Sequence, residues 1–236
     1  MLAQIVLFDG FDLLDALAPY EVLHAGGKAS GGALRAELVS AEGPREVVSG
    51  VGGVPLRATA ALDPARADLV VLPGAAGRVG EPGEVPDHGA DADAGGGRQG
   101  EWREDEFIPV LLGRTLNTAL PGLLKAAMDR PETTVATVCG GSLVLAMAGL
   151  LEGRNATTHH MGLDTLDATG VNAVRARVVD DGDLVTAAGV TSGLDLGLYL
   201  LEREVGPRIA HAVEELFAYE RRGTPWRHHG PSPVAL

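Results

Sequence analysis

The chain has 236 residues, of which 45% are hydrophobic and 22% charged, so it has the length and composition of a globular protein with a sizeable core. A net charge of −13 argues against a nucleic-acid partner, because a phosphate binder needs a basic face, and weakly against an anionic membrane surface. The single cysteine, Cys139, excludes an internal disulfide. No apolar run approaches the roughly 20 residues of a membrane span, and we expect no signal peptide, because the N-terminal residues lead directly into an apolar strand without a basic stretch. We therefore expect a cytoplasmic protein.

The first third of the chain predicts strands with one early helix. Apolar runs bounded by turn residues predict strands over residues 3–8, 33–40, 46–49, 54–58 and 68–72. Pro19 suits the first turn of a helix, which would place Asp15 in the loop before that helix or at its N-cap. The strand at 68–72 ends in Pro73-Gly74-Ala75, a turn of the kind that parallel sheets offer at their ligand-binding edge.

Composition changes sharply over residues 78–106. This stretch is rich in Gly, Pro, Asp and Glu and carries about half of the excess negative charge, as a long solvated loop does. We interpret it as a surface insertion, with a lid over a site as the second interpretation.

The rest of the chain alternates helices and strands. Helical periodicity predicts helices over 107–116, 120–128, 162–168, 192–204 and 207–219, and apolar runs predict strands over 135–138, 156–159, 173–179 and 184–187. This alternation predicts an α/β fold with a doubly wound, mostly parallel sheet covered by helices on both faces. We expect one domain over residues 1–222 and a poorly ordered tail over 223–236.

The strongest chemical signal surrounds Cys139. A β-branched run ends on this cysteine, and Gly140, Gly141 and a helix-forming run follow directly, which is typical of a sharp turn from strand to helix. The side chain at such an apex is exposed at the carboxyl edge of the sheet and faces the positive end of a helix, so we expect a lowered thiol pKa and a nucleophilic cysteine. The alternative is that Cys139 is a small buried hydrophobic residue.

Three further segments are expected beside this cysteine at the same edge of the sheet. Asp15 would place a carboxyl group near the thiol for proton exchange, although the capping of a helix is an equally ordinary role for this residue. The backbone N–H of Gly140, with one from Gly74 or Ala75, would stabilise negative charge on a bound substrate. His159 ends a predicted strand just after the elbow helix and would supply a proton or orient the thiol, or else is a satisfied, partly buried histidine.

Other site types have weaker support. Thr191 would line the same crevice, but a capping role at the helix it precedes explains it equally well. The histidines lack the spacing of a metal site, and neither a dinucleotide fingerprint nor a phosphate-binding loop is present. We expect no metal and no cofactor.

Four stretches in the same order resemble the ThiJ/PfpI superfamily, also called class I glutamine-amidotransferase-like, and its isonitrile hydratase-like branch in particular. They are Leu14–Leu23, Val71–Gly74, Thr137–Leu145 and Ala156–His159, and the similarity continues through Gly189–Asp195. It covers nearly the whole chain apart from the 78–106 stretch and the tail.

The resemblance implies a flavodoxin-like fold, a homodimer and a small-molecule substrate. It implies that the Cys139 thiolate adds to an isonitrile carbon, that Asp15 supplies the proton and that water releases an N-substituted formamide. Isonitrile hydratase has a threonine where this chain has Gly140, protease-like relatives have a histidine there, and Ala75 replaces the second glycine of the usual Pro-Gly-Gly turn.

Two other functions remain open at this point. One is a cysteine enzyme with the same residues acting on a reactive aldehyde or a biosynthetic intermediate. The other is a ligand-binding or sensory module without turnover, because relatives of this fold occur in transcription regulators.

Overall fold

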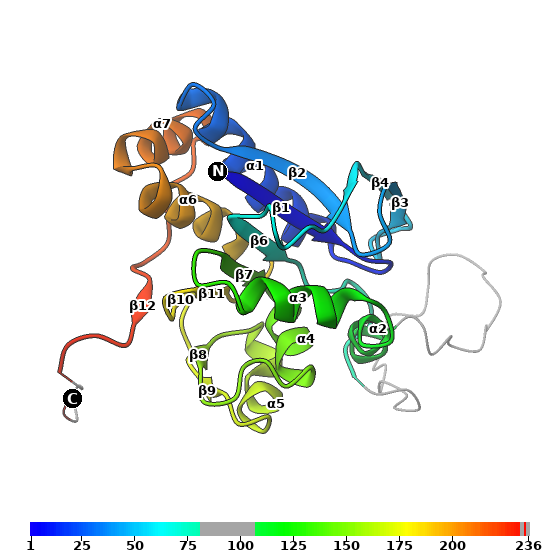
Figure 1. Cartoon of the computed structure of the whole chain (residues 1–236). Coiled ribbons are helices and arrows are strands. Elements are labelled where there is room, and N and C mark those ends of the chain that lie inside the picture. The colour runs from blue at the N-terminus through cyan, green and yellow to red at the C-terminus, as the bar shows by residue number, and fades with distance from the viewer. Residues whose placement is uncertain (81–106, 232–233, 235–236) are drawn as a thin grey trace, which may run out of the picture.

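A mostly parallel sheet forms the centre of the computed structural model, which describes residues 1–80, 107–231 and 234 (Figure 1). Its eight strands lie in the order β12 (Trp226–Arg227), β10 (Val178–Asp180), β11 (Leu184–Ala187), β7 (Thr134–Val138), β6 (Leu69–Leu72), β1 (Leu2–Leu7), β2 (Arg35–Ser40) and β5 (Ala60–Ala61). Only the pair β10–β11 is antiparallel. Strands β1 and β6 are buried along their whole length, as expected for apolar runs that have helices on both sides.

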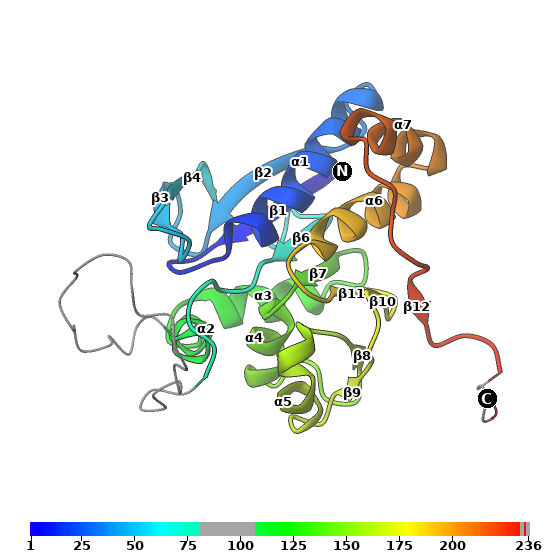
Figure 2. The same cartoon turned by 180° about the vertical axis from the view of Figure 1, so that it is seen from behind.

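Two layers of helices cover the sheet, as Figures 1 and 2 show from opposite sides. One layer contains α1 (Leu13–Ala29), α6 (Ser192–Glu204) and α7 (Pro207–Phe217); the other contains α2 (Ile108–Thr115), α3 (Leu120–Met128), α4 (Gly141–Met147) and α5 (Leu163–Asp167). The predicted doubly wound, flavodoxin-like α/β architecture is therefore confirmed. Within the described residues, no helix combines the length and the apolarity that crossing a bilayer requires.

The start of α1 differs from the prediction. The helix begins at Leu13, so Pro19 lies inside it and not in its first turn. Asp12 is the N-cap residue, and its carboxylate accepts hydrogen bonds from the backbone N–H groups of Leu14 and Asp15. Asp15 therefore occupies the first turn of the helix and is not its cap.

Helix α1 packs closely against α6. A β-carbon on Gly193 would lie 3.1 Å from Cδ of Pro19, and one on Gly197 would lie 2.9 Å from Cβ of Val22. The two helices can approach this closely because α6 presents glycines along the contact. The contact fixes α1, and with it Asp15, relative to the sheet.

Three smaller predictions were wrong. The strand expected over 156–159 is replaced by the shorter β8 (Asn155–Ala156), which pairs with β9 (Asn172–Ala173). A 3-10 turn over His160–Gly162 follows. The strand expected over 173–179 is divided into β9 and β10. Trp226 and Arg227 of the supposedly disordered tail form β12, because Arg227 pairs with Asp180 of β10.

The early hairpin pairs β3 (Arg45–Val48) with β4 (Pro55–Ala58), as the two predicted runs imply.

The predicted insertion lies outside the described residues from position 81 to 106. Its flanks are joined, since the Ile108 N–H donates to the carbonyl of Arg78 over 2.9 Å.

Candidate active site

The turn from β7 into α4 has the geometry of a strained elbow. Cys139 follows β7 directly and has a φ of +54°, one of two non-glycine residues among those described with positive φ. An L-residue in this left-handed region carries strain that surrounding contacts must hold. The backbone N–H of Cys139 supplies such a contact, since it is shared between the carbonyls of Ala187 at 3.0 Å and Ala188 at 2.9 Å.

Two hydroxyl groups hold the carbonyl of the same residue. Thr158 Oγ1 donates to the Cys139 oxygen over 2.8 Å, and Ser142 Oγ donates to it over 3.3 Å. Thr158 was not predicted as a site residue, although it directly precedes the predicted His159. The predicted elbow is thus present, and both the N–H and the carbonyl of Cys139 at its apex are hydrogen-bonded.

Gly141 explains the second glycine of the motif. A β-carbon at this position would lie 2.3 Å from the carbonyl oxygen of Leu72, at the end of β6. The first turn of α4 therefore rests directly on the neighbouring strand, and a side chain would push the elbow away from the loop that follows β6.

Asp15 lies next to the elbow and is fully buried. Its Oδ2 accepts a hydrogen bond of 3.0 Å from the backbone N–H of Gly74, whereas its Oδ1 has no hydrogen-bond partner. A buried carboxyl oxygen without a partner is uncommon, because such a group loses the water that solvates it elsewhere. This incompletely paired carboxyl group also interacts with the Cys139 thiol.

Asp15 and Cys139 both become negative when they ionise, so each disfavours ionisation of the other. Burial and the nearby Asp12 raise the pKa of Asp15 well above its usual value, although the hydrogen bonds from Gly74 and Cys139 work in the opposite direction. Burial and the charge of Asp15 raise the pKa of Cys139 as well, against the hydrogen bond from Gly140. The predicted lowering of the thiol pKa is therefore wrong. The single amide of Gly140 does not outweigh lost solvation and a neighbouring carboxylate.

Gly74 brings these groups together. A β-carbon on Gly74 would lie 2.6 Å from the Gly140 nitrogen, 2.9 Å from Oδ2 of Asp15 and 3.2 Å from Cβ of Cys139. The loop after β6 is also tied to the loop after β1, since the Asp12 N–H donates to the Gly74 carbonyl over 2.9 Å. Four of the predicted positions, Asp15, Gly74, Cys139 and Gly140, therefore meet at one place.

Ala75 lies in the same loop and is buried opposite Phe11. The hydrogen bonds that join the two loops involve the N–H groups of Asp12 and Ala76, so the Ala75 N–H is outside this ladder. The Gly74 N–H is already bound to Asp15. The prediction combined the Gly140 N–H with one from this turn, and within the turn only the Ala75 N–H is not used by Asp15.

His159 and Thr191 make no hydrogen bond to Asp15, Gly74 or Cys139 in the described part of the chain. The His159 Nδ1 accepts a hydrogen bond from the Met161 N–H, and its ring lies against Gly189, whose added β-carbon would be 3.2 Å from Cδ2. Burial and the neighbouring His160 lower the pKa of His159, which favours a neutral ring. Thr191 does not cap α6 through its side chain; it is exposed and accepts a hydrogen bond from Arg177 over 3.0 Å.

An ion pair between the half-buried Arg177 and the buried Asp195 supports the segment behind the elbow. Arg177 Nε donates to Asp195 Oδ2 over 2.6 Å, and Tyr219 Oη donates to the same oxygen over 2.9 Å. The other oxygen of Asp195 accepts the N–H of Arg222. The backbone N–H of Ala188 donates to the Arg177 carbonyl, and the carbonyl of the same Ala188 accepts from the Cys139 N–H. The network is therefore linked to the elbow through Ala188. Sequence reasoning missed Arg177, which no local motif marks.

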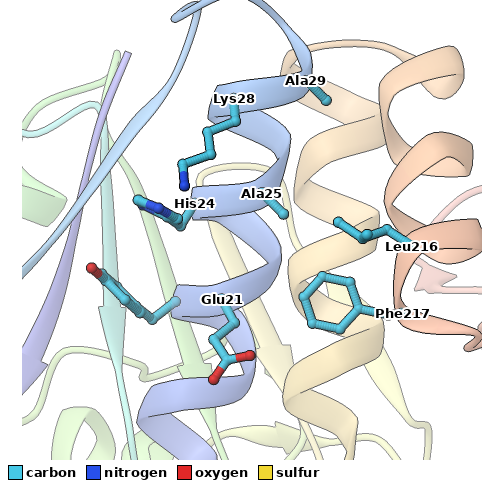
Figure 3. Close-up of a pocket in the computed structure, with 8 residues that line it drawn as sticks. Glu21, His24, Ala25, Lys28, Ala29, Leu216 and Phe217 are labelled. Atoms are coloured by element: carbon cyan, nitrogen blue, oxygen red, sulfur yellow. The ribbon is translucent and has the colours of Figure 1, made fainter.

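The cluster is separate from an open groove between α1 and α7, which has a volume of about 750 Å³ (Figure 3). In that groove Ala25 of α1 faces Leu216 and Phe217 of α7, with Glu21 and Lys28 on the α1 side (Figure 3). Among the described residues, no three His, Cys, Asp or Glu side chains are grouped in a way that would hold a metal ion.

Comparisons with known proteins show which proteins this chain resembles. A family model described as the DJ-1/PfpI family matches residues 114–203. Isonitrile hydratase of Pseudomonas putida is 46% identical over 85 residues, which are 36% of this chain and 37% of that protein. The HTH-type transcriptional regulator CdhR of Pseudomonas aeruginosa is 32% identical over 124 residues, which are 50% of this chain and 37% of the regulator. The chain thus spans a little over a third of the length of these two relatives.

The fold is shared with a solved structure of Drosophila melanogaster DJ-1beta. The two have a TM-score of 0.70 at 17% sequence identity, over 93% of this chain and 98% of that one. This likeness shows that the fold is shared, and the matched family model and the relatives above show the family. The chain belongs to the DJ-1/PfpI family.

Proposed function

We propose that this protein is a cysteine enzyme that adds water to a small electrophile and converts an isonitrile to an N-substituted formamide. The observation that carries the proposal is the buried pair of Asp15 and Cys139, in which one carboxyl oxygen has no partner. A carboxyl group that keeps its proton to a higher pH than usual is suited to act as a general acid. The similarity to isonitrile hydratase supports the choice of substrate.

The raised pKa values of both groups are consistent with this chemistry. Ionising both side chains would bring two negative charges together in a buried place, so the pair favours sharing a proton. Transfer of the thiol proton to an ionised Asp15 forms a thiolate without changing the net charge of the pair. The Gly140 N–H, which bonds to the sulfur, then stabilises the thiolate.

The proposed reaction has two steps that balance. In the first, the sulfur bonds to the isonitrile carbon while Asp15 gives the proton to that carbon, which forms a thioimidate on Cys139. In the second, water adds to the same carbon and the C–S bond breaks. The oxygen of the water stays on the carbon, its two protons go to the nitrogen and to the sulfur, and the N-substituted formamide leaves.

The test is a turnover assay with phenyl isonitrile, in which the formamide is measured by mass spectrometry. We expect product from the wild type, none from Cys139→Ala, and a rate lower by about 10²-fold or more in Asp15→Asn, because the amide cannot exchange the proton. Cys139→Ser is the matched control for side-chain size, and it should be inactive too.

Alkylation of the only cysteine separates failure of the substrate from failure of the site. No formamide, together with alkylation of Cys139 at neutral pH, would show that the nucleophile acts on another electrophile, such as a reactive aldehyde. Full activity in Cys139→Ala would refute the proposal.

A second candidate is a ligand-binding module without turnover. The similarity to the regulator CdhR favours it, since that match covers 50% of this chain. It predicts that a ligand raises the melting temperature of the wild type and of Cys139→Ala equally, with no product formed. Product formation that depends on Cys139 would exclude it.

A further inference from the structure

The side chain of Leu112 fills the space beside the backbone that follows the nucleophile. A β-carbon on Gly140 would lie 3.0 Å from Cδ1 and 3.6 Å from Cδ2 of Leu112, although the backbone angles at Gly140 (φ −68°, ψ −3°) suit any residue. Leu112 is only 2% exposed. Position 140 is therefore limited by its neighbour and not by its own conformation.

Helix α2 holds Leu112 firmly in this place. The preceding residue, Leu111, packs over the loop after β1, where a β-carbon on Gly10 would lie 2.8 Å from its Cδ2. The start of the helix is fixed by the hydrogen bond from the Ile108 N–H to the Arg78 carbonyl, and α2 is in contact with α4. The side chain of Leu112 thus lies against the backbone at Gly140, on the side of the elbow that faces α2.

We propose that Leu112 determines specificity, by limiting the width of the substrate group that lies next to the attacked atom. An atom attacked by the Cys139 sulfur must lie within about 3.5 Å of it. On the Gly140 side, the next group is the apolar side chain of Leu112, so this side accepts a slender group and offers no hydroxyl. The inference rests on the proposed function only in taking Cys139 as the reacting residue.

The test compares alkylation of Cys139 by iodoacetamide, which is small, and N-phenylmaleimide, which is bulky. Cys139 is the only cysteine, so the mass of the intact protein reports its modification. We expect Leu112→Ala to raise the ratio of the bulky to the small rate constant by about tenfold over wild type. Leu124→Ala, a buried leucine of α3, is the matched control and should leave the ratio unchanged.

An equal ratio in Leu112→Ala, Leu124→Ala and wild type would overturn the proposal. Leu112→Val, which removes less volume, takes the place of Leu112→Ala if that variant does not fold, with the same direction expected. The alkylation result is independent of isonitrile turnover, so a wrong substrate leaves this test intact. Turnover by the wild type with an unchanged ratio would refute the role of Leu112 alone.

Thermal unfolding gives a second readout. Gly140→Ala should lower the melting temperature in the wild-type background and lower it less in the Leu112→Ala background, because the space is then free. Additive effects of the two substitutions would show that Leu112 does not limit position 140, and would overturn the inference.

Discussion

Two buried aspartates in the same layer of helices have opposite surroundings. Asp195 has both oxygens occupied, by the Arg177 guanidinium, the Tyr219 hydroxyl and a backbone N–H. Asp15 has one backbone N–H on Oδ2, no partner on Oδ1 and a thiol beside it. Both lie in the first turn of a helix. Position in the secondary structure therefore does not distinguish a structural carboxylate from a candidate catalytic one, whereas the number of satisfied oxygens does.

The difference also predicts opposite effects of substitution. A fully paired carboxylate stabilises the fold, and its loss leaves a cation without its partner. A poorly satisfied one opposes folding and persists where function requires it.

The largest expected effect on stability comes from Asp195→Ala. It leaves Arg177 without its carboxylate and should lower the free energy of unfolding by about 3 kcal/mol. Urea denaturation followed by circular dichroism measures this. A decrease in the free energy of unfolding no larger than that of an ordinary surface substitution would contradict the comparison, since Asp195 would then stabilise the fold no more than Asp15 does.

Gly74→Ala tests the crowding around Asp15. The new methyl group would lie 2.6 Å from the Gly140 nitrogen, so backbone must move, at a cost of about 2 kcal/mol. Gly122→Ala in the exposed part of α3 is the matched control, where nothing lies within 4 Å of the added carbon. It should be neutral or stabilising. Equal unfolding midpoints for the two variants would contradict the crowding.

Asp15→Asn should stabilise the protein at neutral pH by about 1.5 kcal/mol, because it removes a buried group that resists ionisation. The raised pKa means that the folded wild type keeps this proton above about pH 4, where the unfolded chain loses it. Wild-type stability therefore falls with rising pH from there to the folded pKa, and the advantage of the variant grows over that range. Urea denaturation of both proteins between pH 4 and 8 checks this; a difference that does not change with pH would be the contrary result.

The smallest effect concerns the elbow itself. Cys139→Gly should be more stable than Cys139→Ala by about 1 kcal/mol, because glycine accepts the left-handed φ of +54° without strain. Melting temperatures of the two variants measure the difference. A more stable alanine variant would show that the contacts around Cys139, and not its backbone angle, dominate there.

Most of the fold could be predicted from the sequence. Strand β6 is a continuous apolar run, β1 is one apart from Gln4, and the alternation of strands with helices predicts a parallel sheet. The errors arose where local signals compete or are short. Pro19 favoured a helix that starts near it, whereas the helix capped by Asp12 begins at Leu13, six residues before Pro19. Strand β12 has only two residues, and its pairing depends on the distant Asp180.

The candidate site was predicted less completely. The positions of Asp15, Gly74 and Cys139 follow from sheet topology, since parallel strands end at one edge. The direction of the thiol pKa does not, because it depends on how deeply the pair is buried and on the distance between two groups far apart in the chain. Leu112 and Arg177 carry no motif either, and only their three-dimensional contacts identify them.

The outermost strands of the eight-stranded sheet, β5 and β12, are each two residues long. A strand that short leaves few N–H and C=O groups for an incoming chain to pair with, which is a common protection against edge-to-edge aggregation. Self-association by strand addition to this sheet is therefore disfavoured. A homodimer of the kind that the family resemblance implies would then use surfaces other than the edges of this sheet, where side chains determine which partner fits.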